Sequence, residues 1–247
     1  MTTAAEPKRI LLIVHQEQSN PGRLGDALKA RGFVLDRRAP TLGDRLPDSL
    51  DDYAGSVVFG GPMSANDDRM EPGLRAEYQW FETMLQAEKP FIGVCLGAQM
   101  LARTLGRTVA AHPDGAVEIG YSEIFATDEG RDLFPRSMHV YQFHREGLDL
   151  PAGAVRLATN QAYPNQAYRY DHFAWGIQFH PEVTFAMMQR WSSFARMMPP
   201  LPGLQPADET LASHARHDPA LGHWLEGFLD RVFPATAGRK ATRDAAE

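Results

Sequence analysis

The pentapeptide Gly93-Val94-Cys95-Leu96-Gly97 limits the possible folds of this chain more than any other segment. Lys89-Pro90 ends the helix-forming run before it, residues 91–94 predict a short buried strand, and residues 98–105 favour a helix. The pentapeptide is therefore a strand-to-helix corner. A G-x-C-x-G corner has the geometry of a nucleophile elbow, in which flanking glycines allow a tight turn that pushes one side chain out above a sheet. Cys95 is that side chain.

Cys95 is also the only cysteine among 247 residues, so no intrachain disulfide competes for its thiol. The N-terminus of the following helix supplies partial positive charge and free N–H groups, which favour thiolate chemistry and stabilise a developing oxyanion. Cysteine is, however, often just a small buried hydrophobe. The elbow alone leaves both interpretations open, and the rest of the chain has to decide between them.

The segment 175–182 supplies a base for the cysteine. Its alternating apolar residues predict a strand that Pro181 ends, with His180 and Glu182 together at the C-terminal tip. A nucleophilic cysteine needs a base, and the base needs an orienting group. We therefore predict that the fold brings Cys95, His180 and Glu182 together.

A glycine-rich loop supplies a candidate oxyanion donor. Gly60-Gly61-Pro62 follows the predicted strand 56–59, and its glycines allow a backbone N–H to turn toward a neighbouring loop. With the first N–H after the nucleophile, this loop predicts an oxyanion hole formed by Gly61 and Leu96.

Gly60-Gly61-Pro62, residues 93–99 and residues 178–182, in this order, resemble the class I glutamine amidotransferase family. The resemblance covers about residues 8–195 and is closest to free-standing members that look like the glutaminase domain of GMP synthase without the synthetase part. It implies hydrolysis of the γ-amide of L-glutamine through a thioester on Cys95, which yields glutamate and ammonia.

The resemblance also implies substrate-binding residues. They are Gly60, Gln99, His144, Arg145 and Glu146. Gln99 matches the last position of the family's G-x-C-x-G-x-Q, and His144 lies in a turn whose backbone helps to hold the amino-acid end of glutamine. Here that turn is Phe-His-Arg-Glu, whereas Ser-His-Gly-Asp or Asn-His-Gly forms are common in the family. This departure leaves the substrate's identity open, although backbone contacts survive changes of side chain.

Hydrophobic patterning predicts an α/β fold. A continuously apolar strand at 10–14, a helix at 19–32 and a strand from 33 indicate a right-handed crossover in a doubly wound, mostly parallel sheet flanked by helices. Further helices are expected at 72–87 and 184–197. Between the elbow helix and residue 178 the chain is mostly short strands, which should extend the central sheet in part and form a small antiparallel sheet beside it.

The end of the chain predicts an extension to one main domain. We assign residues 1–198 to the amidotransferase-like domain, 199–233 to a C-terminal helical extension behind a proline-rich linker, and 234–247 to a disordered tail. The extension reads as two short helices, 207–216 and 219–233. Its second helix has an apolar stripe that we expect to dock on the chain's own domain.

Charge and hydrophobicity limit the kinds of partner that this protein is expected to bind. The formal net charge of −6 and the pI near 5.8 provide no basic field, so we expect no nucleic-acid partner. The apolar stretch 10–14 is too short for a signal or a membrane span, and no later segment reaches ~18 apolar residues. We therefore expect a cytoplasmic protein without a membrane partner. No metal or cofactor is expected, because the nucleophile, base and donors all lie in the chain.

The remaining features leave alternatives. The substrate is expected to be a small molecule, and a separate synthetase is a possible partner that would receive ammonia; the oligomeric state is left open. One alternative is a free-standing γ-glutamyl hydrolase or peptidase acting on other γ-glutamyl amides. Another is a low-activity regulatory or binding subunit. His15 and His112, which follow predicted strands, are interpreted as structural histidines.

Overall fold

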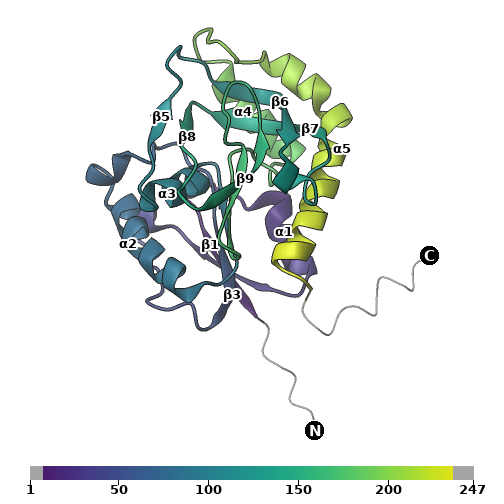
Figure 1. Ribbon diagram of the computed structural model, residues 1–247. Coiled ribbons are helices and arrows are strands. Elements are labelled where there is room, and N and C mark those ends of the chain that lie inside the picture. Colours follow the sequence, from purple (N-terminus) through teal and green to yellow (C-terminus); the bar gives the residue numbers. More distant parts are fainter. Residues whose placement is uncertain (1–7, 236–247) are drawn as a thin grey trace, which may run out of the picture.

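The computed structural model describes residues 8–235, and its centre is a nine-stranded sheet in the order β2-β1-β3-β4-β11-β10-β9-β6-β7 (Figure 1). A separate two-stranded sheet pairs β5 with β8. The strands are β1 Arg9–Ile13, β2 Val34–Arg38, β3 Tyr53–Val58, β4 Phe91–Val94, β5 Val109–Ala111, β6 Glu118–Ala126, β7 Ser137–His144, β8 Glu146–Leu148, β9 Ala154–Thr159, β10 Ala167–Tyr170 and β11 Ala174–Ile177.

The large sheet has a parallel half and an antiparallel half. Strands β2, β1, β3, β4 and β11 are parallel to one another, whereas β10, β9, β6 and β7 continue the sheet beyond β11 through antiparallel pairs. The predicted doubly wound α/β fold is thus confirmed, and so is the expectation that the second half of the chain both extends this sheet and forms a small antiparallel one. The parallel half aligns the carboxyl ends of β1, β3, β4 and β11 on one edge, where loops that bear functional residues usually lie.

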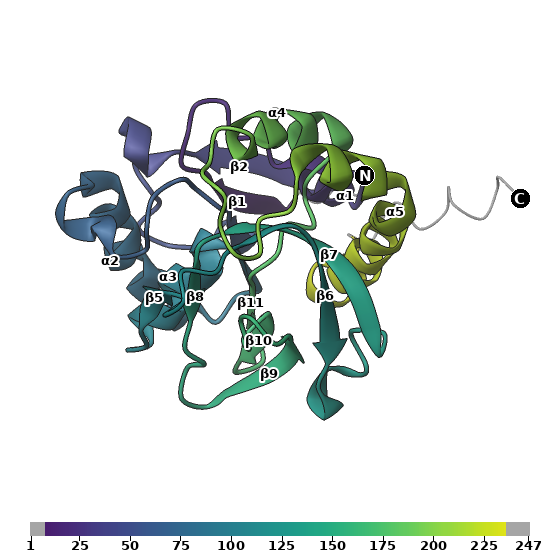
Figure 2. The same cartoon turned by 90° about the horizontal axis from the view of Figure 1, so that it is seen from above.

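Helices cover both faces of the parallel half. They are α1 Gly22–Ala30, α2 Pro72–Ala87, α3 Leu96–Thr104, α4 Phe185–Ala195 and α5 Ala207–Val232, with short 3₁₀ helices at Pro40–Leu42, Asp67–Arg69 and Asp128–Gly130. Successive residues of β1 point to opposite faces: Ile10 and Leu12 pack in one cluster with α1 and α5, while Leu11 and Ile13 pack in another with α2 and α3. Figures 1 and 2 show these two helical layers on either side of the sheet.

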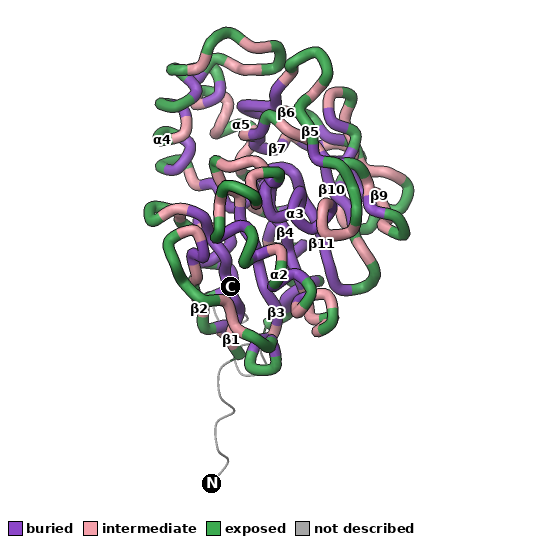
Figure 3. The backbone as a smooth tube through the Cα atoms, turned by 90° about the vertical axis from the view of Figure 1, so that its left-hand side faces the viewer, coloured by how far each residue is buried: buried purple, intermediate pink, exposed green. Residues whose placement is uncertain are grey.

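The central strands are the most buried part of the molecule. Strand β4 and strand β11 are buried at every position, and exposed backbone gathers in the outer loops (Figure 3). Continuous burial on both faces explains why these strands are uninterrupted apolar runs. The elbow at Cys95 therefore starts from a rigid strand.

The C-terminal extension differs from its prediction in one respect, because residues 207–232 form a single helix instead of two. Pro219 lies inside it, although proline lacks an N–H and crowds the preceding turn. Both sides of Pro219 are held by tertiary contacts. Asp218 is paired with Arg23 on α1, and Leu221 and Trp224 are buried in the core. The tertiary packing of α5 therefore outweighs the tendency of Pro219 to interrupt the helix.

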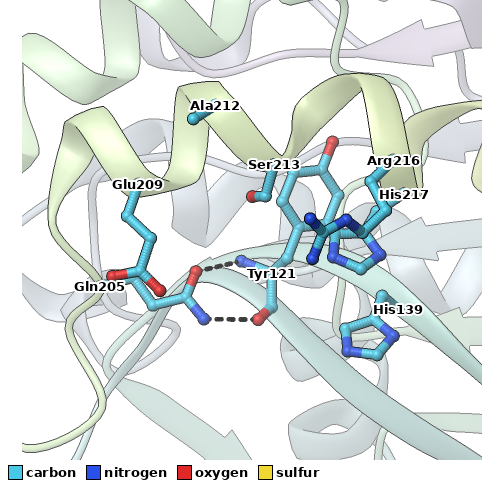
Figure 4. Close-up of a pocket in the computed structure, with 8 residues that line it drawn as sticks. All are labelled: Tyr121, His139, Gln205, Glu209, Ala212, Ser213, Arg216 and His217. Atoms are coloured by element: carbon cyan, nitrogen blue, oxygen red, sulfur yellow. Dashed lines mark hydrogen bonds between the residues drawn. The ribbon is translucent and has the colours of Figure 1, made fainter.

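The proline-rich linker runs along β6 as an additional extended segment. Val117 N–H donates to the Pro202 carbonyl, and the Gln205 amide bonds both the N–H and the C=O of Tyr121 at 2.8 and 2.7 Å (Figure 4). The linker is therefore anchored to the sheet before α5 begins. Of the predicted tail 234–247, only residues 234 and 235 belong to the described part of the chain.

No helix among residues 8–235 combines the length and the apolar character needed to cross a membrane.

Candidate active site

Cys95 occupies the tight corner that its sequence predicts. Its backbone has φ +50°, a region that non-glycine residues seldom adopt, and it lies between β4 and the first residue of α3. A Cβ on Gly93 would lie 2.6 Å from the carbonyl carbon of Gly97, and a Cβ on Gly97 would lie 2.2 Å from the Val58 oxygen. Both glycines are thus required for strand and helix to approach so closely.

His180 and Glu182 form the predicted pair beside the elbow. His180 Nδ1 lies 2.8 Å from Glu182 Oε1, and both side chains are buried. Strand β11 ends at Ile177, earlier than the sequence predicts, because the chain then turns so that His180 N–H donates to the Tyr141 carbonyl on β7 at 2.8 Å. With Nδ1 occupied, the buried Nε2 is the ring nitrogen that remains available to Cys95.

The electrostatics of this pair favour a charged imidazole. Burial alone would lower the pKa of His180, but the Glu182 carboxylate and the Cys95 sulfur outweigh it and raise that pKa to about 10. His180 is therefore protonated at neutral pH.

The glycine loop after β3 lies against the same two residues. A Cβ on Gly60 would lie 2.8 Å from His180 Cε1 and 3.5 Å from Cys95 Cβ, so only glycine leaves this space open. Gly61 packs beside Leu96: a Cβ there would meet Leu96 Cδ2 at 2.9 Å. The N–H groups of Gly61 and Leu96 donate no hydrogen bond within the described residues.

Two of the predicted substrate-binding residues, Gln99 and His144, meet at the carbonyl group of a third, Glu146. Gln99 Nε2 donates to the Glu146 carbonyl at 2.9 Å, and His144 Nδ1 lies 2.9 Å from the same oxygen. The His144 ring is buried and its Nε2 lies 3.0 Å from Glu118 Oε2, so this side chain fixes the turn from its buried side. The Arg145 side chain, in contrast, is exposed.

The polar loop after the glycines is tied to this turn. Ser64 Oγ donates to Glu146 Oε1 at 3.0 Å, and Asn66 Nδ2 donates to the Val109 carbonyl at 3.0 Å. Residues 64–70 therefore lie next to the predicted substrate-binding turn rather than extending freely into solvent.

Two residues near the site have tertiary contacts that the sequence does not predict. His15, at the end of β1, is fully buried and pairs with Glu77 on α2 behind the Gly60 carbonyl. Gly22, at the start of α1, has φ +55°, and a Cβ there would lie 2.0 Å from the Glu182 carbonyl oxygen. The sequence places His15 after a predicted strand and Gly22 near the start of a predicted helix. No local pattern, however, indicates which distant residue either of them contacts.

The hollow drawn in Figure 4 is separate from this group of residues. It is bordered by β6, β7, the linker and α5. None of the predicted site residues lines it; its lining residues are Tyr121, His139, Gln205, Glu209, Ala212, Ser213, Arg216 and His217. Within residues 8–235, no cluster of three or more histidine, cysteine, aspartate or glutamate side chains is arranged to hold a metal ion.

Residues 20–191 match the family model for class I glutamine amidotransferases. The chain belongs to this family. Among its relatives is the glutamine amidotransferase-like protein YfeJ of Salmonella typhimurium, 30% identical over 71% of this chain and 76% of YfeJ. Another is a subunit of the glutamine-hydrolysing GMP synthase of Methanospirillum hungatei, 34% identical over 53% of this chain and 64% of that relative.

Solved amidotransferase structures resemble the whole fold. A glutamine amidotransferase from Thermotoga maritima superimposes with a TM-score of 0.81 at 30% identity, over 92% of this chain and 98% of that one. A glutamine amidotransferase from Methylobacillus flagellatus gives 0.83 at 27% identity, over 92% and 94%. The coverage extends beyond the family-model match, so these structures share more than its residues 20–191 with this class I amidotransferase.

Proposed function

We propose that this protein hydrolyses the γ-amide of L-glutamine to glutamate and ammonia through a thioester on Cys95. The observation that carries the proposal is the placement of Cys95, at a strained elbow, beside a His180 ring whose other nitrogen is held by Glu182. Nucleophile, base and orienting carboxylate in this arrangement suit acyl transfer.

In the proposed reaction, His180 holds the thiol proton and the Cys95 sulfur attacks the amide carbon, forming a C–S bond as the carbonyl electrons move to oxygen. Collapse of this intermediate breaks the C–N bond, and His180 gives its proton to the departing ammonia. Water then attacks the thioester as His180 takes one of its protons. The C–S bond breaks, which releases glutamate and leaves the proton on His180, as at the start.

The negative oxygen of the intermediate would be bound by the N–H groups of Gly61 and Leu96. Both groups lack other acceptors among the described residues, and their residues pack against each other beside Cys95. Unused backbone donors beside a nucleophile are typical of an oxyanion hole.

The Gly60 loop and the turn 144–146 are the proposed walls of the substrate site. Gln99 and His144 both bond the Glu146 carbonyl and so fix the backbone of the turn that would hold the amino-acid end of the substrate. An exposed Arg145 in this turn is the feature that favours a second candidate, a larger γ-glutamyl amide. Similarity to the GMP synthase subunit of Methanospirillum hungatei supports a synthetase partner that receives the ammonia. Cytoplasmic localisation stays a prediction.

The test is ammonia release by the purified chain from glutamine and a panel of γ-glutamyl amides. We expect hydrolysis of at least one of them, and a loss of about 10⁴-fold or more in Cys95→Ala because no other group replaces the nucleophile. Thermal melting of Cys95→Ala is the control for folding. Wild-type turnover by a folded Cys95→Ala protein would show that Cys95 is not the nucleophile. No hydrolysis by the wild-type chain would favour the alternative of a regulatory or binding role.

A further inference from the structure

A second buried histidine–glutamate pair lies directly behind the glycine loop of the site. His15 Nδ1 is 3.0 Å from the Gly60 carbonyl oxygen, and His15 Nε2 is 3.1 Å from Glu77 Oε2. Both side chains are 0% exposed. The His15 carbonyl in turn accepts a hydrogen bond from Thr41 Oγ1 at 2.8 Å, which anchors the backbone that carries the ring.

Both nitrogens of the His15 ring face oxygen acceptors. The Gly60 carbonyl can only accept, and an ionised Glu77 can only accept, so both nitrogens carry protons when Glu77 is charged. Burial opposes this charge, but Glu77 and the Gly60 carbonyl raise the pKa of His15 above its ordinary value. When both nitrogens carry protons, the hydrogen bond from Nδ1 to Gly60 is charge-assisted.

The Gly60 carbonyl and the Gly61 N–H belong to one planar trans peptide, so they point in opposite directions. When His15 holds the carbonyl on its side, the N–H must point away from His15. We propose that the His15–Glu77 pair is a positioning pair that orients the Gly61 N–H as an oxyanion donor and polarises its peptide. This inference rests on the proposed function.

Within the described residues, the bond to His15 is the only hydrogen bond that the Gly60–Gly61 peptide makes. Glycine peptides rotate with little steric hindrance, and the N–H of Gly61 has no acceptor among the described residues. Gly60 must also remain free of a side chain because Cys95 and His180 occupy that space. A flexible peptide at this point would spend part of its time with the N–H turned away from the reacting oxygen.

A purely structural role would predict a different pattern of defects. Loss of packing would lower stability and affect every reaction of Cys95 alike. An orienting role lowers only those reactions that build negative charge on a carbonyl oxygen. It therefore lowers kcat while the KM for the substrate changes little, because the donor is used mainly in the transition state.

The main variant is the double substitution His15→Leu and Glu77→Met, which removes both polar partners and leaves no unpaired buried charge. We expect kcat to fall by about 10- to 100-fold with KM within about threefold, since loss of a whole oxyanion donor costs about 10²–10³. Glu77→Gln is the conservative variant: its amide can donate to Nε2, so Nδ1 keeps its proton and its bond to Gly60. It should retain more activity than the double variant.

Two reagents separate oxyanion binding from thiol reactivity. 5-Oxopentanoate is an aldehyde analogue of glutamine without its amino group. The Cys95 sulfur adds to its aldehyde carbon, forming a C–S bond as the C=O electrons move to oxygen while His180 keeps the proton, so this oxygen needs the same donors. Iodoacetamide alkylates Cys95 by displacing iodide and forms no oxyanion. The double variant should bind the aldehyde about 10-fold or more weakly, whereas its alkylation rate stays near wild type. Tyr53→Phe, which removes a hydrogen bond to Asp36 at the other end of β3, is the control and should change neither.

The inference would be overturned if a folded double variant kept wild-type kcat and aldehyde affinity, or if aldehyde binding and alkylation fell by the same factor. Failure of the proposed function gives a different result, namely no amide hydrolysis by the wild-type chain. The aldehyde and iodoacetamide measurements need no turnover, so they still test the His15–Glu77 pair in that case.

Discussion

Cys95 is held at φ +50°, a conformation that costs about 1–3 kcal/mol for a residue with a side chain. Two hydrogen bonds hold it there: its N–H donates to the Ile177 carbonyl at 2.8 Å, and its own carbonyl accepts from Gln99 N–H at 3.0 Å. The strain directs the sulfur toward His180. At the residue scale, the proposed chemistry thus depends on backbone geometry as much as on the identity of the side chains.

The raised pKa of His180 predicts the pH dependence of the reaction. Wild-type kcat/KM should fall as pH rises through about 10, because His180 then lacks the proton that the departing ammonia needs. Glu182→Gln removes the charge that opposes the effect of burial, so the alkaline limb of its kcat/KM profile should move to lower pH.

His180→Asn should lower kcat/KM by about 10⁴-fold at neutral pH, and Glu182→Gln should lower it less. Rate profiles from pH 6 to 10.5 measure both effects.

The free energy of unfolding should fall with rising pH over the same range as kcat/KM. Because the pKa of folded His180 lies above the ordinary value of 6.5, its protonation adds stability that is complete below pH 6.5 and is lost as pH rises through about 10. Chemical denaturation over this range is the control. An unchanged alkaline limb in a folded Glu182→Gln protein would contradict the assigned role of Glu182.

At the scale of elements, the start of α1 supports the loop that bears Glu182. Arg23 N–H donates to the Glu182 carbonyl at 3.0 Å, and the Arg23 guanidinium bonds both the Val183 carbonyl and Asp218 on α5. Gly22 allows this approach because it has no Cβ. Helix α5 also contributes Trp224, whose ring lies 5.2 Å from that of Phe179, next to His180. Helices α1 and α5 thus both stabilise the loop that contains His180 and Glu182.

Two glycine-to-alanine substitutions should have opposite effects. Gly227 lies on the exposed side of α5 with open space around its missing Cβ, so Gly227→Ala should raise the free energy of unfolding by about 0.5–1 kcal/mol. Gly22→Ala should lower it and reduce kcat, because its Cβ would displace the Glu182 carbonyl at a strained φ. Urea denaturation and ammonia release measure the two effects. Equal stability changes would contradict this packing.

For the whole molecule, the C-terminal extension is part of the main core. Its apolar stripe is buried against the sheet face that also bears α1 and α4, as the sequence predicted; the stripe includes Leu221, Trp224, Leu225, Phe228 and Val232. Each large side chain buried in this way contributes about 1.5–3 kcal/mol. The division at residue 198 stays a prediction about folding units, and only a truncated chain tests it.

Truncation after Pro202 should therefore lower the melting temperature and the solubility of the chain. Removal of α5 would expose the side chains of Phe134 and Phe179, both of which contact Trp224. Scanning calorimetry and size-exclusion light scattering compare the truncated and full-length chains. A well-folded truncated monomer derived from a full-length dimer would indicate instead that α5 belongs to an interface between copies.

Local patterns were enough to predict the elbow at Cys95, the pairing of His180 with Glu182 and the α/β fold; these patterns are flanking glycines, a strand ended by proline, and apolar runs. No local pattern predicts that α5 continues through Pro219 or that His15 meets Glu77, 62 residues away. A local pattern sets the backbone of its own segment. The partner of a buried charge, and the helix that survives a proline, are set by whichever distant side chains the completed fold places against them.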